Sequence, residues 1–288
     1  PYKMQNRLWK AGMRPINALV DITNYVMLAT GSPSHAYDAD NIVDHIVVRH
    51  AKEDEKLMLL NDKVLDLCTD DLVIADGEGP VGLAGVMGGA KDSILPKTER
   101  VILEVANFDA AGIRRTALRY DNRTEASARY EKAIDPERCE QAVALSMQYF
   151  KELYPELKVT GFCDNYVKKL KRAQIDVSLS WLEKRLGKHL TNDVIRGKLE
   201  KLGFDVQIDG DNMHVTAPTW RSTGDISIKD DVMEEVARMY GYDNFDATEF
   251  TTTFTGAINQ KDKSLIRNIK EYLAIRCGMQ EVYTYPWM

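Results

Sequence analysis

A change in hydrophobic pattern along the chain is the feature that most constrains its fold. Residues 46–105 contain short apolar runs separated by Asp, Asn and Gly, such as "IVVRHA", "LVIAD" and "RVILEVANF". These runs predict strands joined by turns. Helical spacing follows at 108–118 and 136–153, where Asp135-Pro136 predicts the start of the second helix. Residues 1–165 are therefore predicted to form a mixed α+β domain.

The segment before these strands leaves two interpretations open. Residues 15–28, "PINALVDITNYVML", have the spacing of a helix but also fit a buried strand followed by a turn. The next residues, "GSPSH", predict a loop because Gly, Ser and Pro favour irregular backbone.

A second module is predicted after a charged linker at 166–172. Ser180 and Glu183 have the spacing of a capping box that begins a short helix, and Thr191 predicts the N-cap of a second helix. "FDVQI" and "MHVTA" alternate across Asp-Gly and predict a hairpin. A third helix is expected at 229–240. Two helices, a hairpin and a helix are typical of a small winged-helix-like domain, which we place at 173–248.

The ends of the chain indicate a fragment of a longer protein. The sequence does not begin with Met and stops at "YTYPWM", a strand-like aromatic run. Residues 249–288 are expected to begin a further unit, with an amphipathic helix at 262–276.

Composition excludes several classes of protein. The 288 residues carry a net charge of −6, whereas proteins that grip nucleic-acid backbones usually have a basic excess. No apolar run is long enough to span a membrane. The four cysteines are far apart and form no CxxC pair, which argues against a zinc knuckle or a disulfide framework. We expect a cytoplasmic protein without a DNA or membrane partner.

Three stretches of the first domain are candidate parts of a site. His35 in "GSPSHAYD" could transfer protons or bind a ligand, although a loop histidine more often caps a turn. Gly88-Gly89 would let a ligand approach the backbone closely, or would form a plain tight turn. Glu104 in "ILEVANF" lies on the same side of a predicted strand as Ile102 and Ala106. Its carboxylate therefore faces either solvent or a partner that offsets the cost of burying it.

Two further stretches raise similar questions. In "RYDNRTEASARYEKAIDP", Thr124, Ala126 and Ser127 stand between arginines, as in a lining rather than a core. In the second module Asp231, Glu234 and Glu235 share the first two turns of a predicted helix, and Asp225 lies upstream. Such carboxylates could bind Mg²⁺, but a helix N-terminus also favours acids without any metal.

The sequences of these stretches, and their order along the chain, closely resemble those of one family. "DITNYV", "SHAYDAD", "ILEVANF", "ASARYE..IDP" and "EEVARMYGYDNF" are similar, as an ordered set, to the β subunit of bacterial-type phenylalanyl-tRNA synthetase. The resemblance covers nearly the whole chain. It implies an editing module (B3/B4) over 1–165, a B5 module over 173–248 and the start of a class II catalytic-like domain from 249.

The resemblance also implies a function. The family is similar across bacteria in forming an (αβ)₂ heterotetramer that charges tRNA(Phe), in which the α subunit performs ATP-dependent aminoacylation and the β subunit hydrolyses misacylated Tyr-tRNA(Phe). A pocket shaped for Phe rejects an added hydroxyl by only roughly a hundredfold in comparable cases, so a second sieve is needed.

Site residues follow from the same resemblance. Glu104 would accept a hydrogen bond from the tyrosine hydroxyl, and its inward orientation is then expected. His35, Thr124, Asn24, Gly88, Gly89 and Ala126 would complete the editing pocket. Hydrolysis is expected to use a positioned water, with His35 as a possible general base. Asp225, Asp231, Glu234 and Glu235 match Mg²⁺-associated carboxylates.

The sequence departs from the family pattern in three places. "WRSTGDI" has extra residues before Asp225, which puts its placement in doubt. Tyr37 stands where Phe is common, and Lys132-Ala133 stands where Arg-Gly is common. Two other functions compete with editing by the synthetase: a non-catalytic module for RNA binding or subunit assembly, and a free-standing editing hydrolase, which the downstream module disfavours.

Overall fold

The chain folds into two units that are described separately. The computed structural model describes residues 1–91, 93–247, 249, 251–253, 256 and 260–286. Contacts divide the chain into one unit at Pro1–Phe245 and another at Asp246–Met288. The first unit combines helices with antiparallel sheets, so the predicted α+β class is confirmed.

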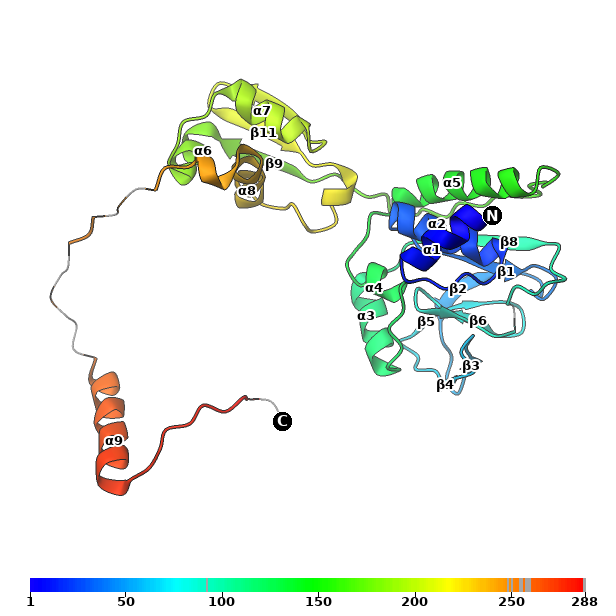
Figure 1. Ribbon diagram of the computed structural model, residues 1–288, viewed down its shortest axis with the longest axis horizontal. Coiled ribbons are helices and arrows are strands. Elements are labelled where there is room, and N and C mark those ends of the chain that lie inside the picture. The colour runs from blue at the N-terminus through cyan, green and yellow to red at the C-terminus, as the bar shows by residue number, and fades with distance from the viewer. Residues whose placement is uncertain (92, 248, 250, 254–255, 257–259, 287–288) are drawn as a thin grey trace. The chain divides into compact units, whose positions relative to one another are not determined.

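A two-stranded sheet with helices on one face forms the first layer of the structure (Figure 1). In this sheet β1 (Ser34–Asp38) pairs with β8 (Val101–Val105). Helices α2 (Ala18–Thr30) and α5 (Arg138–Leu153) pack on it, and α1 (Tyr2–Lys10) packs on α2. The core between these elements is formed by Met4, Leu8, Ile22, Val26, Ala142 and Phe150.

Local signals explain why α2 is a helix and not a strand. The Asn17 side chain accepts a hydrogen bond from the Val20 amide at 3.0 Å, which makes it an N-cap. Gly31, with φ 76°, ends the helix in the left-handed conformation. The predicted loop at "GSPSH" is wrong from Ser34 onward, because β1 begins there. Helix α5 begins at Arg138, two residues later than predicted.

Short antiparallel strands form the second layer, on the other side of β1 and β8 (Figure 1). A four-stranded sheet has the order β2-β5-β6-β7, and β3 pairs with β4. The bounds of these strands are Val47–His50 for β2, Lys56–Met58 for β3, Val64–Asp66 for β4, Leu72–Ala75 for β5, Pro80–Leu83 for β6 and Met87–Gly88 for β7. Their buried side chains, such as Val73, Val81 and Leu83, form a core cluster together with Tyr37 of β1 and Leu59 after β3.

Two helices close the side of this second layer. They are α3 (Ala110–Arg119) and the single-turn α4 (Ser127–Tyr130). The buried carboxylate of Asp71 fixes α3, because it accepts hydrogen bonds from Thr116 at 2.9 Å and from Arg119. The segment between α3 and α4 carries Thr124 and Ala126. The hydrogen bonds of Asp71 therefore help to position residues that were predicted to belong to the site.

The second module has the predicted helices and hairpin together with a strand that the sequence analysis missed. Strand β9 joins the hairpin in a sheet of order β10-β11-β9. The bounds are Gln174–Ser178 for β9, Leu179–Leu186 for α6, Asn192–Glu200 for α7, Asp205–Asp209 for β10, Asn212–Thr216 for β11 and Lys229–Tyr240 for α8. The predicted capping box is wrong: Ser178, not Ser180, is the N-cap of α6 and accepts from the Trp181 amide.

The second unit contains α9 (Lys261–Cys277), close to the helix predicted at 262–276. The predicted boundary at 248/249 includes Thr248, which lies outside the described residues, and the predicted domain limits stay predictions. Within the described part of the chain, no helix combines the length and the apolar character needed to cross a membrane.

Candidate functional site

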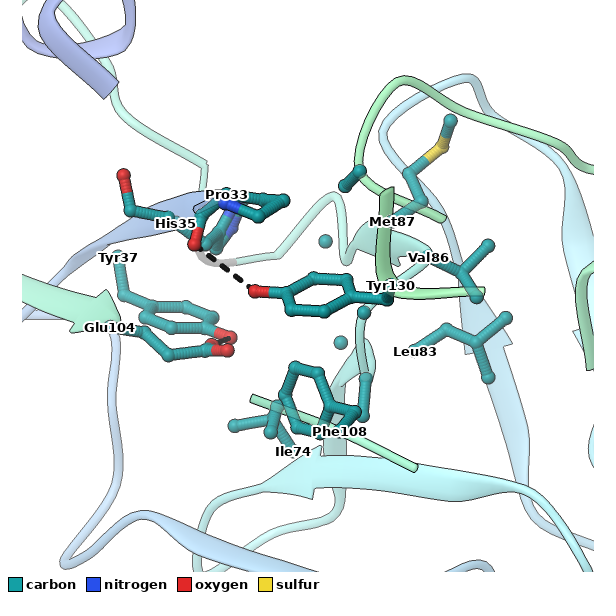
Figure 2. A pocket seen from close by; sticks show the side chains of 16 residues that line it. Pro33, His35, Tyr37, Ile74, Leu83, Val86, Met87, Glu104, Phe108 and Tyr130 are labelled. Atoms are coloured by element: carbon teal, nitrogen blue, oxygen red, sulfur yellow. Dashed lines mark hydrogen bonds between the residues drawn. The ribbon is translucent and has the colours of Figure 1, made fainter. Parts of the chain in front are cut away.

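A pocket of about 70 Å³ opens where the two layers of the first domain meet. The inner face of β1 and β8 forms one side of it, the β6–β7 turn forms another, and α4 closes it (Figure 2). The lining residues are Pro33, Ser34, His35, Tyr37, Ile74, Gly82, Leu83, Ala84, Gly85, Val86, Met87, Gly88, Glu104, Phe108, Ala126 and Tyr130.

Glu104 faces into this pocket, and the arrangement of the layers explains why. On β8, Leu103 and Val105 pack against the helical layer, whereas Ile102 and Ala106 pack against the strand layer. Because side chains alternate along a strand, Glu104 shares the face of Ile102 and Ala106. Both faces of β8 are covered, so the alternative that Glu104 faces bulk solvent is wrong.

The Glu104 carboxylate is desolvated and has one phenol partner. The hydroxyl of Tyr37 donates a hydrogen bond of 2.5 Å to Oε2 of Glu104 (Figure 2). Burial raises the pKa of Glu104 above its ordinary value, and the Tyr37 hydrogen bond acts in the opposite direction. Tyr37 itself is only 2% exposed, so this contact is part of the pocket interior.

His35 lies opposite Glu104 in the register of β1 and β8. Burial lowers the pKa of the His35 imidazole from 6.5 to about 4, so the ring is neutral near pH 7. Its ring packs edge-on against Tyr37 with centroids 4.6 Å apart. A Cβ placed on Gly88 in β7 would clash with the imidazole, so a larger residue there would displace the His35 ring.

An aromatic wall that the sequence analysis missed completes the pocket. Tyr130 is buried and donates hydrogen bonds of 3.0 Å to the carbonyls of Pro33 and Ala106, and its ring packs edge-on against Phe108. A Cβ on Gly85, whose φ is 67°, would approach Phe108 to 2.9 Å. Tyr130 follows the Thr124–Ser127 stretch closely, and its aromatic character was the available signal.

The structure brings most, but not all, of the predicted pocket residues together. His35, Gly88, Glu104 and Ala126 line the cavity. Thr124 stands behind its wall, where its hydroxyl donates a hydrogen bond of 2.7 Å to the Val86 carbonyl.

Two predicted residues have other positions. The Gly89 amide donates to the Val81 carbonyl at 2.8 Å, so Gly89 belongs to the strand pairing beside the pocket. Asn24 is half-buried in α2 and is not among the lining residues. The arginines of this region pair with local acids, Arg123 with Glu131 and Arg129 with Glu125.

The four carboxylates predicted to bind Mg²⁺ have other partners. Asp225 and Glu235 both accept hydrogen bonds from Arg221, at 2.7 Å in the case of Glu235. Asp231 accepts from the amides of Ser227 and Ile228 at 2.7 and 2.9 Å and so caps α8. Glu234 is exposed.

As arranged, these residues do not fit a magnesium ion. Burial works to raise the pKa of Glu235, but the hydrogen bonds from Arg221 and Arg238 outweigh it and hold the pKa below its ordinary value. The guanidinium of Arg221 therefore supplies the positive charge between two of the four carboxylates. Over the described residues, no group of three or more His, Cys, Asp or Glu side chains is arranged to hold a metal ion. The Mg²⁺ assignment stays a prediction.

Comparisons with known proteins match both modules. The B3/4 domain family model matches residues 1–155, the region that contains the pocket, and the tRNA synthetase B5 domain model matches residues 175–242. The chain belongs to the B3/4 family of phenylalanine–tRNA ligase β subunits.

Curated β subunits are similar over the whole chain but extend well beyond it. The phenylalanine–tRNA ligase β subunit of Lactobacillus acidophilus is 40% identical over 286 residues, which are 99% of this chain and 35% of that protein. Those of Halalkalibacterium halodurans and Solibacter usitatus are 39% and 37% identical, over 99% and 100% of this chain and 35% and 38% of theirs. The chain thus spans about a third of the length of these β subunits.

A solved structure gives a more distant match. An N-terminal fragment of the phenylalanyl-tRNA synthetase β subunit from Pyrococcus horikoshii is 16% identical, with a TM-score of 0.39 over 78% of this chain and 65% of that one.

Proposed function

We propose that this chain carries the editing site of a phenylalanine–tRNA ligase β subunit and that it hydrolyses misacylated Tyr-tRNA(Phe). The observation that supports this most directly is the desolvated carboxylate of Glu104, which lines a pocket together with apolar and aromatic side chains. Such a carboxylate binds a ligand that donates a hydrogen bond more tightly than a ligand of the same shape that lacks the donor.

The physical argument for selectivity is the second hydrogen bond that a tyrosyl ligand adds to a desolvated carboxylate, beside the one from Tyr37. A tyrosyl side chain donates its hydroxyl proton to Glu104, and a hydrogen bond to a charged group contributes about 1.5–3 kcal/mol. A phenylalanyl side chain would fill the same space and leave this acceptor without that donor. Sites built to pair a substrate hydroxyl discriminate strongly against analogues that lack it.

Hydrolysis in this proposal uses a water molecule held at the ester. Among the described lining residues, no serine or cysteine is arranged with a histidine and an acid as an activated nucleophile. With a pKa of about 4, His35 is a weak general base at neutral pH. We therefore assign His35 to orienting the water or the ester, so that proximity and orientation supply the rate.

The partners in this proposal follow from the family. The chain acts as part of a β subunit that joins an α subunit in an (αβ)₂ heterotetramer, binds tRNA(Phe) and works in the cytoplasm, while ATP and Mg²⁺ serve aminoacylation by the α subunit. The alternative is a non-catalytic RNA-binding or assembly module. The converging pocket of Glu104, His35 and Tyr130 favours a site that holds a small side chain.

The test is deacylation of Tyr-tRNA(Phe) and Phe-tRNA(Phe) by the reconstituted αβ enzyme that carries this β sequence. We expect the tyrosyl ester to be hydrolysed much faster than the phenylalanyl ester. Equal slow rates for both esters, at the level of buffer alone, would support the assembly role instead.

A further inference from the structure

The contact between Tyr37 and Glu104 has a consequence beyond the general editing function. Tyr37 lies on the same face of β1 as His35 and close to Glu104 on β8. The hydroxyl of Tyr37 donates a hydrogen bond of 2.5 Å to Oε2 of Glu104 (Figure 2). This chain therefore places a phenol of its own on the carboxylate that is proposed to recognise a substrate phenol.

We propose that Tyr37 is a positioning residue for substrate discrimination, which fixes Oε2 of Glu104 and leaves Oε1 to accept the hydroxyl of the bound tyrosyl group. The inference rests on the proposed editing function. It requires that the carboxylate accept two donors at once, which a carboxylate with about four lone-pair sites can do.

The geometry of the pocket holds Tyr37 in this role. Tyr37 and Glu104 lie on adjacent strands and on the same face, because Glu104 pairs with His35 and Tyr37 is two residues further along β1. The Tyr37 ring is buried against the main core. A Cβ on Gly82 would approach the Tyr37 hydroxyl oxygen to 3.4 Å, so the backbone of β6 limits the movement of the phenol. Across the described residues, no second donor reaches the Glu104 carboxylate.

The electrostatic setting gives this hydrogen bond its effect. Burial raises the pKa of Glu104, and the Tyr37 hydrogen bond lowers it. The other titratable groups facing the carboxylate are His35 across the strand pair and Tyr130 on α4, and burial favours the neutral form of both. Neither supplies a positive charge near neutral pH. The Tyr37 hydroxyl thus stabilises the ionised acceptor.

Replacing Tyr37 by Phe tests the proposal, because it removes only the hydroxyl and keeps the buried ring in the core, so the variant is expected to fold. Without the hydroxyl, the pKa of Glu104 rises further and its charged form is lost at a higher pH. A protonated carboxyl group is the weaker acceptor. We expect the preference for Tyr-tRNA(Phe) over Phe-tRNA(Phe) to fall about tenfold in Tyr37→Phe at the pH where its Glu104 carboxyl group is protonated, and to recover as the pH rises.

Two measurements on the reconstituted αβ enzyme separate the inference from the proposed function. The first is the ratio of Tyr-tRNA(Phe) to Phe-tRNA(Phe) deacylation as a function of pH. The second is infrared titration of the Glu104 carboxyl group, assigned by subtraction of Glu104→Gln. Tyr130→Phe is the matched control, because it removes a phenol from the same pocket that donates to backbone carbonyls and not to Glu104.

We expect the carboxyl titration to move upward in Tyr37→Phe and to stay near the wild-type position in Tyr130→Phe. An unchanged titration together with an unchanged deacylation ratio would overturn the inference and leave editing intact. Better discrimination by Tyr37→Phe at every pH would also overturn it, because Tyr37 would then occupy the substrate's place. Absence of deacylation in the wild type, with the titration shift present, would reject editing but not the role of Tyr37 in ionising Glu104.

Discussion

At the scale of single residues, burial acts in opposite directions on the two groups that face each other across β1 and β8. It raises the pKa of Glu104 and lowers the pKa of His35, and in each case it favours the neutral form. The single phenol donor from Tyr37 opposes this effect at Glu104. A second phenol from a ligand would add to it, which is the basis of the proposed recognition.

His35 leads to a prediction on acid stability. Its folded pKa of about 4 lies below the ordinary value of 6.5, so the unfolded chain binds a proton before the folded chain does. Folding stability is therefore lost as the pH falls from 6.5 towards 4. We expect His35→Gln to lose less stability than the wild type between pH 7 and pH 5 in urea unfolding. Parallel losses in the two proteins would show that His35 is not buried as described.

Ala133 leads to a prediction on backbone strain. It has φ 53°, in the left-handed region that favours glycine. We expect Ala133→Gly to raise the free energy of unfolding by about 0.5–1 kcal/mol. The matched control is Ala144→Gly, at an exposed position within α5, which should lower it by about 1 kcal/mol. Destabilisation by both changes would contradict the assigned backbone conformation.

At the scale of elements, the β6–β7 turn leads to a prediction about two neighbouring glycines. A Cβ on Gly88 would clash with the His35 side chain, whereas a Cβ on Gly89 would lie 2.5 Å from the carbonyl oxygen of Val81. The His35 side chain can move to relieve its clash, whereas moving the paired backbone of β6 at Val81 would cost more free energy. We expect Gly89→Ala to lower the melting temperature strongly and Gly88→Ala to lower it little while slowing deacylation. The reverse ranking would contradict the structure of the turn.

The helix α8 leads to a prediction about Arg221. Glu235 is 4% exposed and is paired with Arg221 and Arg238. Arg221→Ala removes one of the two guanidinium partners of Glu235 and leaves Arg238 as the other, so the variant should be destabilised by about 1.5–3 kcal/mol. Because Arg221 already neutralises two of the carboxylates, millimolar MgCl₂ should not raise the melting temperature of the wild type. A clear stabilisation by Mg²⁺ would show that the ion displaces the guanidinium.

The elements that could be predicted from sequence are those with local signals. The β10–β11 hairpin was predicted from its Asp-Gly turn. Helix α2 was left open between a helix and a strand, although its Asn17 cap and Gly31 end are local signals. Strands β1 and β9 were missed because their partners β8 and β11 are distant in sequence. The alternation of side chains along β8 shows which residues share a face with Glu104. It does not tell whether a second layer covers that face, so the orientation of Glu104 could not be predicted from it.

At the scale of the whole molecule, the site depends on packing between two layers. The β1–β8 sheet buries its outer face under helices and turns its inner face, with His35, Tyr37 and Glu104, towards the strand layer. Neither layer forms a pocket alone. The chain also spans about a third of the length of the curated β subunits to which it is similar, so the proposed activity is best measured in the reconstituted enzyme.

The measurement that tests the central claim most directly is deacylation of Tyr-tRNA(Phe) by the reconstituted αβ enzyme with Glu104→Ala in this sequence. Charging of tRNA(Phe) with phenylalanine serves as the internal control. We expect the variant to lose at least about tenfold in Tyr-tRNA(Phe) deacylation while charging is unchanged, because the acceptor for the hydroxyl is gone. Equal deacylation rates in the variant and the wild type would contradict the claim that Glu104 recognises the tyrosine hydroxyl.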